Sequence, residues 1–486
     1  MSEGSKFPFL PFADAAGRAA YFEAAYLKQL EVTKALEQRI DALERQVALN
    51  SKTSSQPPSS DGLKKPPAQK RTQSLRGKSD RKSGGQPGHK GKTLRQSSTP
   101  DHIIHHYPEV CDACGAALSA SMAEITVVRQ VVDLLAPPPP EVTEHRVHLC
   151  RCGQCDAVTR GVFPECVAGP VQYGPRIAGI ASYLQTYHCI PDERLALVLS
   201  DLFGLSAVPA TLARLIGRTA DRLQPFAKAV CKKLSGPQVA VKHLDETGFR
   251  VAGKTQWLHV ICSPLLSHFR VSSRRGDLLT GVCGLVVHDH WAPYFKMEGV
   301  QHALCNAHHL RELQALIVIE KEPWAADMKT LLLEAKAKAD TRTDDCTVGV
   351  GVIGELLQRY DDILTQAVDF HEAQPPMQAI SKAGKRRGRP KRRTGHNLAL
   401  RLQTRKSEVI RFVTEPHAPF TNNEAERDLR MGKVRQKISG CFRAVSGAEI
   451  FCTLRTVTCT ARKQGWSVIE TLMKPSDQLI AQLRLG

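Results

Sequence analysis

Residues 237–295 constrain the fold more than any other part of the chain, because they read as consecutive β-strands. The segments QVAVKHLDETGFRV, TQWLHVICS and SHFRVSS are rich in β-branched and aromatic residues, and residues 252–254 and Pro264 supply turns between them. A fourth segment, GVCGLVVHDHWAPYF, is almost wholly apolar up to its first histidine, as expected of a strand buried inside a sheet. The sequence therefore predicts a β-sheet whose first three strands follow one another directly.

Two aspartates stand at the ends of these apolar strands. Asp245 is expected where the first strand ends, and Asp289 comes immediately after the fourth. Carboxylates are seldom buried without a partner, so two acids that converge on one edge of a sheet favour a bound metal ion. Taken separately, each has a simpler interpretation, Asp245 as a turn residue and Asp289 as a loop residue.

A third acid, Glu426, lies in the segment FTNNEAERDLRMGKVRQKISGCFR. On a helix that reaches the same edge, it would complete a site of three carboxylates, which suits two Mg²⁺ or Mn²⁺ ions. Two such ions stabilise the attacking and leaving oxygens of a displacement at phosphorus. The simpler interpretation is a capping box at a helix start. Its N-cap would be Thr421 or Asn423, with a glutamate three residues later.

Two Cys-x-x-Cys pairs precede the predicted sheet, and 37 residues separate them. Such knuckles supply four thiolates for a structural Zn²⁺ ion in tetrahedral geometry. Cys150 competes as a ligand in the second pair, and unmetallated core cysteines are the alternative. The expected zinc ligands are Cys111, Cys114, Cys152 and Cys155.

The formal net charge of +19 is concentrated in two stretches of the 486-residue chain. Residues 64–95 carry eleven Lys/Arg and one acid, a net of +10, and residues 382–393 carry eight Lys/Arg and no acid, a net of +8. Charge gathered in this way favours a polyanionic partner, although a solvated charged surface is the alternative. Fifteen scattered cysteines, and no signal-like or membrane-spanning apolar run, favour a reducing cytoplasm.

Helical periodicity dominates two further regions. In residues 1–50, apolar residues at helical spacing predict a short coiled coil and self-association, unless the helix packs on its own protein. A basic linker follows, in which GHKGKT lacks the first glycine and the preceding strand of a phosphate-binding loop. Residues 168–236 break at Gly204, which is compatible with a helix-turn-helix or with a plain helical hairpin.

Several longer motifs occur in one order along the chain. They are QPPSSDG, GGQPGHKG, the paired cysteine knuckles, VQYGP, DETGFRV, HDHWAPYF, HALCNAHHLREL and PFTNNEAERDLRMGKVRQKISGCFR. Together they resemble the insertion-sequence-66 family of bacterial DDE transposases over nearly the whole chain. The resemblance implies a ribonuclease-H-like catalytic domain with Asp245, Asp289 and Glu426 as its acids. The family's Asn-Asn-x-x-Glu-Arg motif falls on Glu426 and leaves Glu424 at a variable position.

The resemblance also implies roles for residues near these acids. The family's Cys-x-x-His motif matches Cys305 and His308, which would support the site, although helix packing is the simpler interpretation. Asn422 and Asn423 would fix the start of the helix that carries Glu426.

The same helix then becomes basic, and its cations are expected along the path of the DNA backbone. Arg430, one turn after Glu426, would also pair with that carboxylate and orient it. The expected DNA contacts on this helix are Arg427, Arg430, Lys433 and Arg435.

An insertion of mostly helical character, at about residues 310–415, must separate Asp289 from Glu426. It contains KRRGRPKRR, which looks like an AT-hook. Arg387 and Arg389 would reach into an A/T-rich minor groove, whose negative potential is enhanced. A generic basic loop that grips phosphates is equally compatible with the residues.

The expected fold class is multidomain α/β, with a ribonuclease-H-like catalytic core that contains a helical insertion. The expected order is a helical, coiled-coil segment (1–50), a basic disordered linker (51–107), a zinc-binding domain (108–167), a helical domain compatible with DNA binding (168–236), the catalytic domain (237–463) and a C-terminal tail (464–486).

The expected function is DNA transposition. Two Mg²⁺ or Mn²⁺ ions would support nicking at element ends and attack of the freed 3′-hydroxyl on target DNA. A catalytically silent DNA-binding or regulatory relative is one alternative, and a ribonuclease-H-like nuclease without strand transfer is another. The expected partners are element-end and target DNA, further copies of the chain and, as the resemblance implies, accessory proteins of the same element. The expected location is cytoplasmic and nucleoid-associated, without a membrane.

Overall fold

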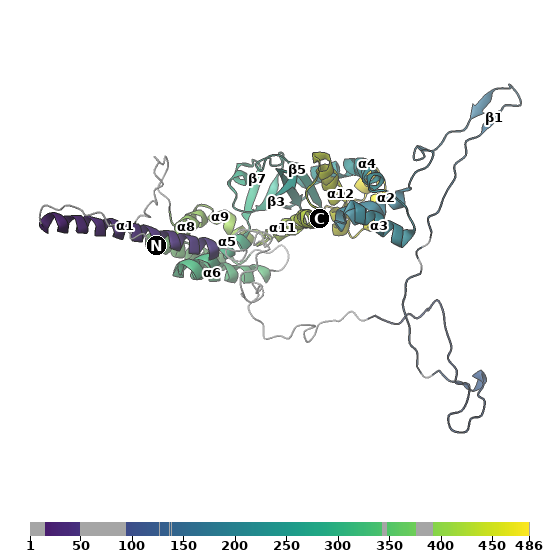
Figure 1. Ribbon diagram of the computed structural model, residues 1–486, viewed down its shortest axis with the longest axis horizontal. Helices are drawn as coiled ribbons and strands as arrows, with labels where there is room; N and C mark the ends of the chain where they lie inside the picture. Colours follow the sequence, from purple (N-terminus) through teal and green to yellow (C-terminus); the bar gives the residue numbers. More distant parts are fainter. Residues whose placement is uncertain are drawn as a thin grey trace, which may run out of the picture. The chain divides into compact units, whose positions relative to one another are not determined.

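The computed structural model describes residues 15–48, 94–125, 127–135, 137, 139–342, 348–375 and 392–485 (Figure 1). The chain divides into a larger unit, formed by Met1–Lys65, Thr143–Asp201 and Leu205–Gly486, and a smaller unit, formed by Pro66–Val142 and Leu202–Gly204. Among the helices in the described ranges, none has both the length and the apolar character needed to cross a membrane. The AT-hook-like segment, with Arg387 and Arg389, lies outside the described residues.

The larger unit contains, in its described part, a mixed five-stranded sheet with the strand order β5-β4-β3-β6-β7. β3 (Val241–Val251), β4 (Lys254–Cys262) and β5 (Ser267–Ser272) are consecutive and antiparallel, which confirms the sequence prediction. β6 (Gly284–His288) runs parallel to β3, and β7 (Val300–Leu304) runs parallel to β6. The sequence does not predict β7, because VQHAL is short and partly polar.

The register brings the two predicted aspartates to the same level of the sheet. β3 and β6 pair from Val241 opposite Leu285 to His243 opposite Val287. Asp245 lies two residues after His243, and Asp289 lies two residues after Val287. The expectation that Asp245 ends its strand is wrong, because β3 stays paired with β4 as far as Val251. What ends near Asp245 is the parallel pairing with β6.

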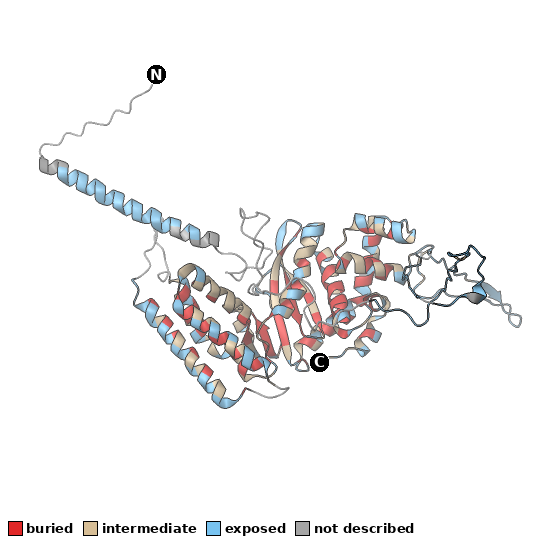
Figure 2. Ribbon diagram, turned by 90° about the horizontal axis from the view of Figure 1, so that it is seen from below, coloured by how far each residue is buried: buried red, intermediate tan, exposed pale blue. Residues whose placement is uncertain are grey.

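Two C-terminal helices cover β3, β4 and β5. α11 (Asn423–Ser439) contacts β3 and β4, and α12 (Val445–Gln464) contacts β5. Figure 2 shows the sheet and the helices against it as largely buried. Because side chains alternate along a strand, Asp245 shares a face of β3 with Phe249, which packs against α11 and α12. Other members of this core include Leu258, Phe269, Leu429 and Phe451.

α11 lies close to the sheet because residue 432 is a glycine. A Cβ at Gly432 would stand 2.6 Å from Leu258 Cδ2 in β4. The N-cap of α11 is Asn422, so the predicted cap at Thr421 or Asn423 is wrong. Asn422 makes no side-chain capping hydrogen bond, because its amide is bonded to the sheet instead.

The predicted helical insertion lies between β7 and α11. It packs as a series, with α5 on α6, α6 on α7 and α7 on α8, while α9 and α10 contact β7. Its apolar core is continuous with β6 and β7 and includes Leu304, Trp324, Tyr360 and Phe412. The elements are α5 (Asn306–Ala315), η5 (Leu316–Glu320), α6 (Pro323–Asp340), α7 (Val350–Glu372), α8 (Thr394–Thr404), α9 (Lys406–Val409) and α10 (Arg411–Thr414), and η4 (Ala292–Lys296) precedes β7.

Helices before and after the sheet in the sequence also pack together. α4 (Pro209–Ser235) contacts α2 (Pro175–Ser182), α12 and α14 (Ser476–Ala481). This packing uses one long apolar face of α4, which includes Leu212, Ile216, Leu223 and Phe226. Nearby elements are η3 (Tyr183–Tyr187), α3 (Asp192–Phe203) and α13 (Val468–Met473).

Four further elements of the described residues precede this region. α1 (Ala15–Ala48) confirms the predicted N-terminal helix, and its described side chains are exposed. Its pairing as a coiled coil stays a prediction. η2 (Ala120–Met122) belongs to the smaller unit, whereas the hairpin of β1 (Leu149–Arg151) and β2 (Val158–Arg160) belongs to the larger one.

Candidate active site

Asp245 in β3 and Asp289, the first residue after the adjacent parallel strand β6, are both half-buried. Burial raises the pKa of Asp245 well above its ordinary value, and so do the charges of its acidic neighbours, which are Glu246, Asp289 and Glu426. Burial also raises the pKa of Asp289, although the N–H of Trp291 donates to its Oδ1 at 2.9 Å. Crowded carboxylates of this kind are stabilised by a divalent cation.

Glu246, the neighbour of Asp245 in β3, has partners of its own. An Arg275 nitrogen lies 2.6 Å from its Oε1, and the Tyr294 hydroxyl donates to its Oε2. The Arg275 guanidinium also lies over the rings of Trp291 and Trp257, at 4.1 and 5.2 Å from their centroids. Glu246 is therefore neutralised by a cation of the protein, unlike the aspartate that precedes it.

Glu426 lies in the first turn of α11 and faces α5. His308 Nε2 is 3.8 Å from one of its carboxylate oxygens, and an Arg311 nitrogen is 3.7 Å from the other. Burial lowers the pKa of His308 to about 4, helped by the charge of Arg311, so the imidazole is neutral at neutral pH. Arg311 is thus the cation that pairs with Glu426. The expectation that Arg430 does so is wrong, because Arg430 is exposed and the carboxylate is turned toward α5.

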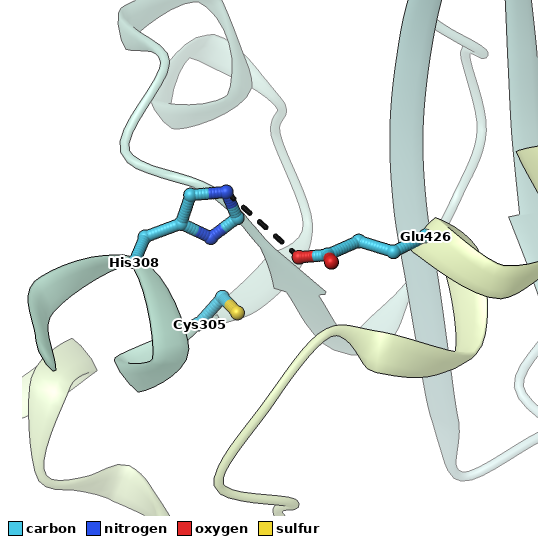
Figure 3. A group of neighbouring side chains, drawn as sticks. All are labelled: Cys305, His308 and Glu426. Atoms are coloured by element: carbon cyan, nitrogen blue, oxygen red, sulfur yellow. Dashed lines mark ion pairs between the residues drawn. The ribbon is translucent and has the colours of Figure 1, made fainter. Parts of the chain in front are cut away.

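Cys305, His308 and Glu426 form a compact group, here called the Cys-His-Glu cluster (Figure 3). One ligand atom from each lies within 4.8 Å of the other two. In the part of the chain that the structure describes, the oxygens of the three predicted acids do not form a group of this kind. The structure therefore brings Glu426 near enough to affect the pKa of Asp245, but with its carboxylate directed at His308.

Asn422 connects the pieces of the site. Its Nδ2 donates to the Leu244 carbonyl at 2.7 Å, and its Oδ1 lies 2.9 Å from His243 Nδ1. Its backbone N–H donates to Cys305 Sγ at 3.1 Å. The residue is buried, whereas Asn423 is exposed at the first position of α11. Asn422 thereby fixes the helix of Glu426 to the strand of Asp245 and to α5.

Glu424 belongs to a different contact on α11. Lys463 of α12 lies 3.0 Å from Glu424 and 3.0 Å from Asp428, and the Ser267 hydroxyl donates to Asp428 at 2.6 Å. These bonds join α11 to α12 and β5. Glu424 is therefore a structural ion-pair partner, and Glu426 is the glutamate on the side of the aspartates.

The residues predicted to contact DNA from α11 differ in exposure. Arg427 and Arg430 are exposed, and Arg427 lies 3.7 Å from Glu424. Lys433 donates to the Gly248 carbonyl, and Arg435 lies over the Phe442 ring at 5.0 Å. Burial lowers the pKa of Lys433 and of Arg435. DNA contact by this set stays a prediction, with its exposed members the better placed.

Each cysteine knuckle forms a tight turn. In the first, Gly115 has a φ of 74° and its N–H donates to the Cys111 carbonyl at 2.9 Å. Backbone N–H groups of Cys114 and Ala113 lower the pKa of Cys111. In the second, N–H groups of Gln154 and Cys155 lower the pKa of Cys152 in the same way. Both turns therefore favour a thiolate at their first cysteine.

Sequence reasoning missed two cations of the site. Arg311 lies three residues after His308 on α5, so helical spacing within HALCNAHHLREL was an available signal. Arg275 has no such signal, because it lies in the loop after β5 and 29 residues from its partner Glu246.

Comparison with known proteins gives two family matches. The family model described as "Transposase IS66 family" matches residues 170–450, which is more than half of the chain. A family of unknown function matches residues 14–95. No curated protein matches the chain.

Proposed function

Because the chain belongs to the IS66 family of transposases, we propose that it cuts DNA at the ends of an insertion sequence and joins the freed 3′-hydroxyl to target DNA. We assign this chemistry to Asp245, Asp289 and Glu426. The assignment is supported by the register of β3 and β6, which brings Asp245 level with Asp289, the first residue after β6. It is also supported by the contact of α11, which bears Glu426, with β3.

The sheet supports a ribonuclease-H-like core. Three consecutive antiparallel strands are followed by two that run parallel to the first, and the helical insertion comes before α11. This arrangement agrees with the core that the family resemblance implies.

The donor groups fit two Mg²⁺ or Mn²⁺ ions. Asp245 and Asp289 offer carboxylate oxygens, which these ions prefer. Burial raises the pKa of both carboxyls, and the charges of neighbouring acids raise that of Asp245 further. When bound, the ions would stabilise the attacking and leaving oxygens at the scissile phosphate. Arg275 and Tyr294 bind the Glu246 carboxylate, so that this acid already has partners within the protein. Asn422 joins the start of α11 to β3 and thereby positions the third acid.

Conservative substitutions at the acids test the assignment. Asp245→Asn, Asp289→Asn and Glu426→Gln should each lower cleavage of end DNA in Mg²⁺ or Mn²⁺ by more than about 100-fold. Losing a hydrogen-bond partner of a ligand already costs roughly 10- to 100-fold, and losing the ligand should cost more. End binding, measured by gel shift, should change little, because the large basic stretches lie elsewhere in the sequence.

Glu424→Gln is the matched control, because it lies in the same helical turn but pairs with Lys463. It should keep cleavage activity. If Glu424→Gln loses cleavage activity while Glu426→Gln keeps it, the third acid is Glu424. If all three acid variants still cleave, the metal site is refuted.

The same assay separates the alternatives. Cut ends that never join target DNA would indicate a nuclease without strand transfer. End binding by the unaltered chain without cleavage in either metal would indicate a DNA-binding relative.

We also propose a structural Zn²⁺ at Cys111, Cys114, Cys152 and Cys155, supported by the two turns that favour thiolates. Elemental analysis of protein purified without chelator should find zinc.

Self-association through α1 is supported by its exposed apolar side chains, including Tyr26, Leu36, Ile40 and Leu43. Further copies of the chain, and accessory proteins of the same element, are the proposed protein partners.

A further inference from the structure

Two buried polar atoms in the Cys-His-Glu cluster have no hydrogen-bond partner among the described residues. They are His308 Nδ1 and Glu426 Oε1. The nearest approach between the two side chains, from His308 Nε2 to Glu426 Oε1, is 3.8 Å and too long for a hydrogen bond. Buried polar atoms without a partner require an explanation, and a cation held between these side chains is one.

The third member of the cluster is also arranged as a ligand. Cys305 is the N-cap residue of α5, and its Sγ accepts the Asn422 N–H at 3.1 Å. Burial raises the pKa of the Cys305 thiol to about 12, although the Asn422 N–H lowers it, so the thiol keeps its proton until a cation displaces it. His308 follows three residues later, so one helical turn presents both side chains to Glu426 (Figure 3).

We propose that Cys305, His308 and Glu426 form a second metal site, specific for Zn²⁺ and similar borderline cations, whose occupation withdraws Glu426 from the aspartates. Sulfur, imidazole and a single carboxylate oxygen are zinc ligands, and water can take the fourth position. Binding releases the thiol proton, because a coordinated thiol is deprotonated. Mg²⁺ is excluded, because it requires an octahedral shell of oxygens.

The two sites then compete through one side chain. The aspartates and Glu426 offer oxygen to Mg²⁺, whereas the cluster offers sulfur and nitrogen as well as the same carboxylate. The carboxylate already faces His308 and Arg311 rather than the aspartates. Zn²⁺ at the cluster would hold it there. This inhibitory consequence rests on the proposed function, but the binding site itself does not.

Cobalt binding tests the site directly. Full-length protein is titrated with Co²⁺, and the equivalents bound and the visible absorption are compared between the unaltered chain and Cys305→Ala. We expect the variant to lose one equivalent, or to bind it at least about tenfold more weakly. Metal at the cysteine knuckles contributes equally to both proteins and cancels in the difference.

Cys452→Ala is the matched control. Cys452 is another buried cysteine, located in α12 and packed in the hydrophobic core between that helix and the sheet. It should bind as many equivalents as the unaltered chain. Equal binding by all three proteins would overturn the site, and so would the same loss in both variants. His308→Asn, which alters a second ligand, should reproduce the loss seen in Cys305→Ala.

Inhibition is scored as the ratio of Mg²⁺-dependent cleavage with and without micromolar Zn²⁺. The ratio should be low for the unaltered chain and for Cys452→Ala, and near one for Cys305→Ala. Equal ratios in all three would overturn the competition. A chain that cleaves nothing in any metal would refute the proposed function, and the cobalt titration would still decide the binding site.

Discussion

At the scale of single residues, Asn422 is the position where the candidate site depends most on one side chain. Its side chain bonds to the carbonyl just before Asp245 and to His243, and its backbone N–H donates to the sulfur of Cys305. It is the N-cap residue of α11, although its side chain makes no capping bond. A family motif predicts that asparagine starts this helix. Its contacts show that the side chain joins the helix to the sheet, and that an ordinary cap would not replace it.

We therefore expect Asn422→Ala to lower both stability and cleavage. The substitution removes two buried side-chain partners, and a buried polar group left unsatisfied costs about 1–3 kcal/mol. Urea unfolding should show a loss in that range. Asn423→Ala, at the exposed neighbour, should change neither quantity appreciably. A stability loss without loss of cleavage would show that Asn422 supports the fold but not the position of Glu426.

The raised pKa of Asp245 predicts how metal-free protein responds to pH. A carboxyl whose pKa is higher in the folded state adds stability below its ordinary pKa of 3.8, and this contribution is lost as the pH rises through the folded-state value. Asp245→Asn should thus be more stable than the unaltered chain at neutral pH without metal. The difference in melting temperature should shrink as the pH falls toward 4.

Metal provides the control for this prediction. Mg²⁺ should stabilise the unaltered chain more than Asp245→Asn, because the cation relieves the charge that the substitution removes. A difference in melting temperature that does not vary with pH would mean that Asp245 is not the strained carboxyl.

The sequence predicts the three proposed acids, but it specifies only some of the side chains that pair with them. Asp245, Asp289 and Glu426 stand in motifs whose residue types suit a metal. Arg311 replaces the predicted Arg430 because Glu426 turns toward α5, and the direction of a side chain depends on packing between distant segments. Arg275 reaches Glu246 from a loop, where no periodicity marks it.

At the scale of elements, the approach of α11 to the sheet sets the position of Glu426. Gly432 permits that approach, since any side chain there would meet Leu258, a fully buried residue of β4. We expect Gly432→Ala to destabilise the protein by about 1–3 kcal/mol, as overpacking does. It should also reduce cleavage, because relief of the contact moves α11 and its carboxylate away from β3.

Gly447→Ala is the matched helical control. The nearest neighbour of a Cβ at Gly447 in α12 is a Phe442 ring carbon at 3.7 Å, an ordinary contact. It should leave stability unchanged or raise it by up to about 1 kcal/mol, because alanine favours helix over glycine. Urea unfolding measures both variants. Equal effects would show that the α11 contact is not tight.

The elements that sequence predicts best are those with strong periodicity. The sequence predicts β3, β4, β5 and β6 from their apolar, β-branched and aromatic residues. It predicts the turn between β3 and β4 from Ala252 and Gly253, both of which have positive φ in the structure. β7 was missed because a five-residue strand with two polar residues has too little pattern. The position of Asp245 within β3 is not specified by local sequence, because only the parallel pairing with β6 stops near it, while the pairing with β4 continues to Val251.

At the scale of the whole molecule, the proposed catalytic acids and the basic residues lie in different parts of the sequence. Residues 64–95 and 382–393 together hold +18 of the net +19, so the rest of the chain is close to neutral. The carboxylates lie in that near-neutral part. We therefore expect affinity for DNA backbone to come largely from the two basic stretches, independently of the metal site.

Replacing residues 382–393 with an uncharged linker of equal length should weaken DNA binding and flatten its dependence on salt. Each phosphate neutralised contributes about 0.9 to the slope of log affinity against log salt, so eight cations contribute at most roughly seven units.

A charge-preserving variant, Arg387→Lys with Arg389→Lys, separates the two interpretations of the segment. If it acts as an AT-hook, this variant keeps the salt slope but loses preference for A/T-rich duplexes, because lysine fits the narrow minor groove less well than arginine. If it is a generic basic loop, slope and preference both stay as in the unaltered chain. Fluorescence anisotropy with A/T-rich and G/C-rich duplexes at several salt concentrations measures both, and an unchanged slope in the uncharged variant would show that the segment does not contact DNA.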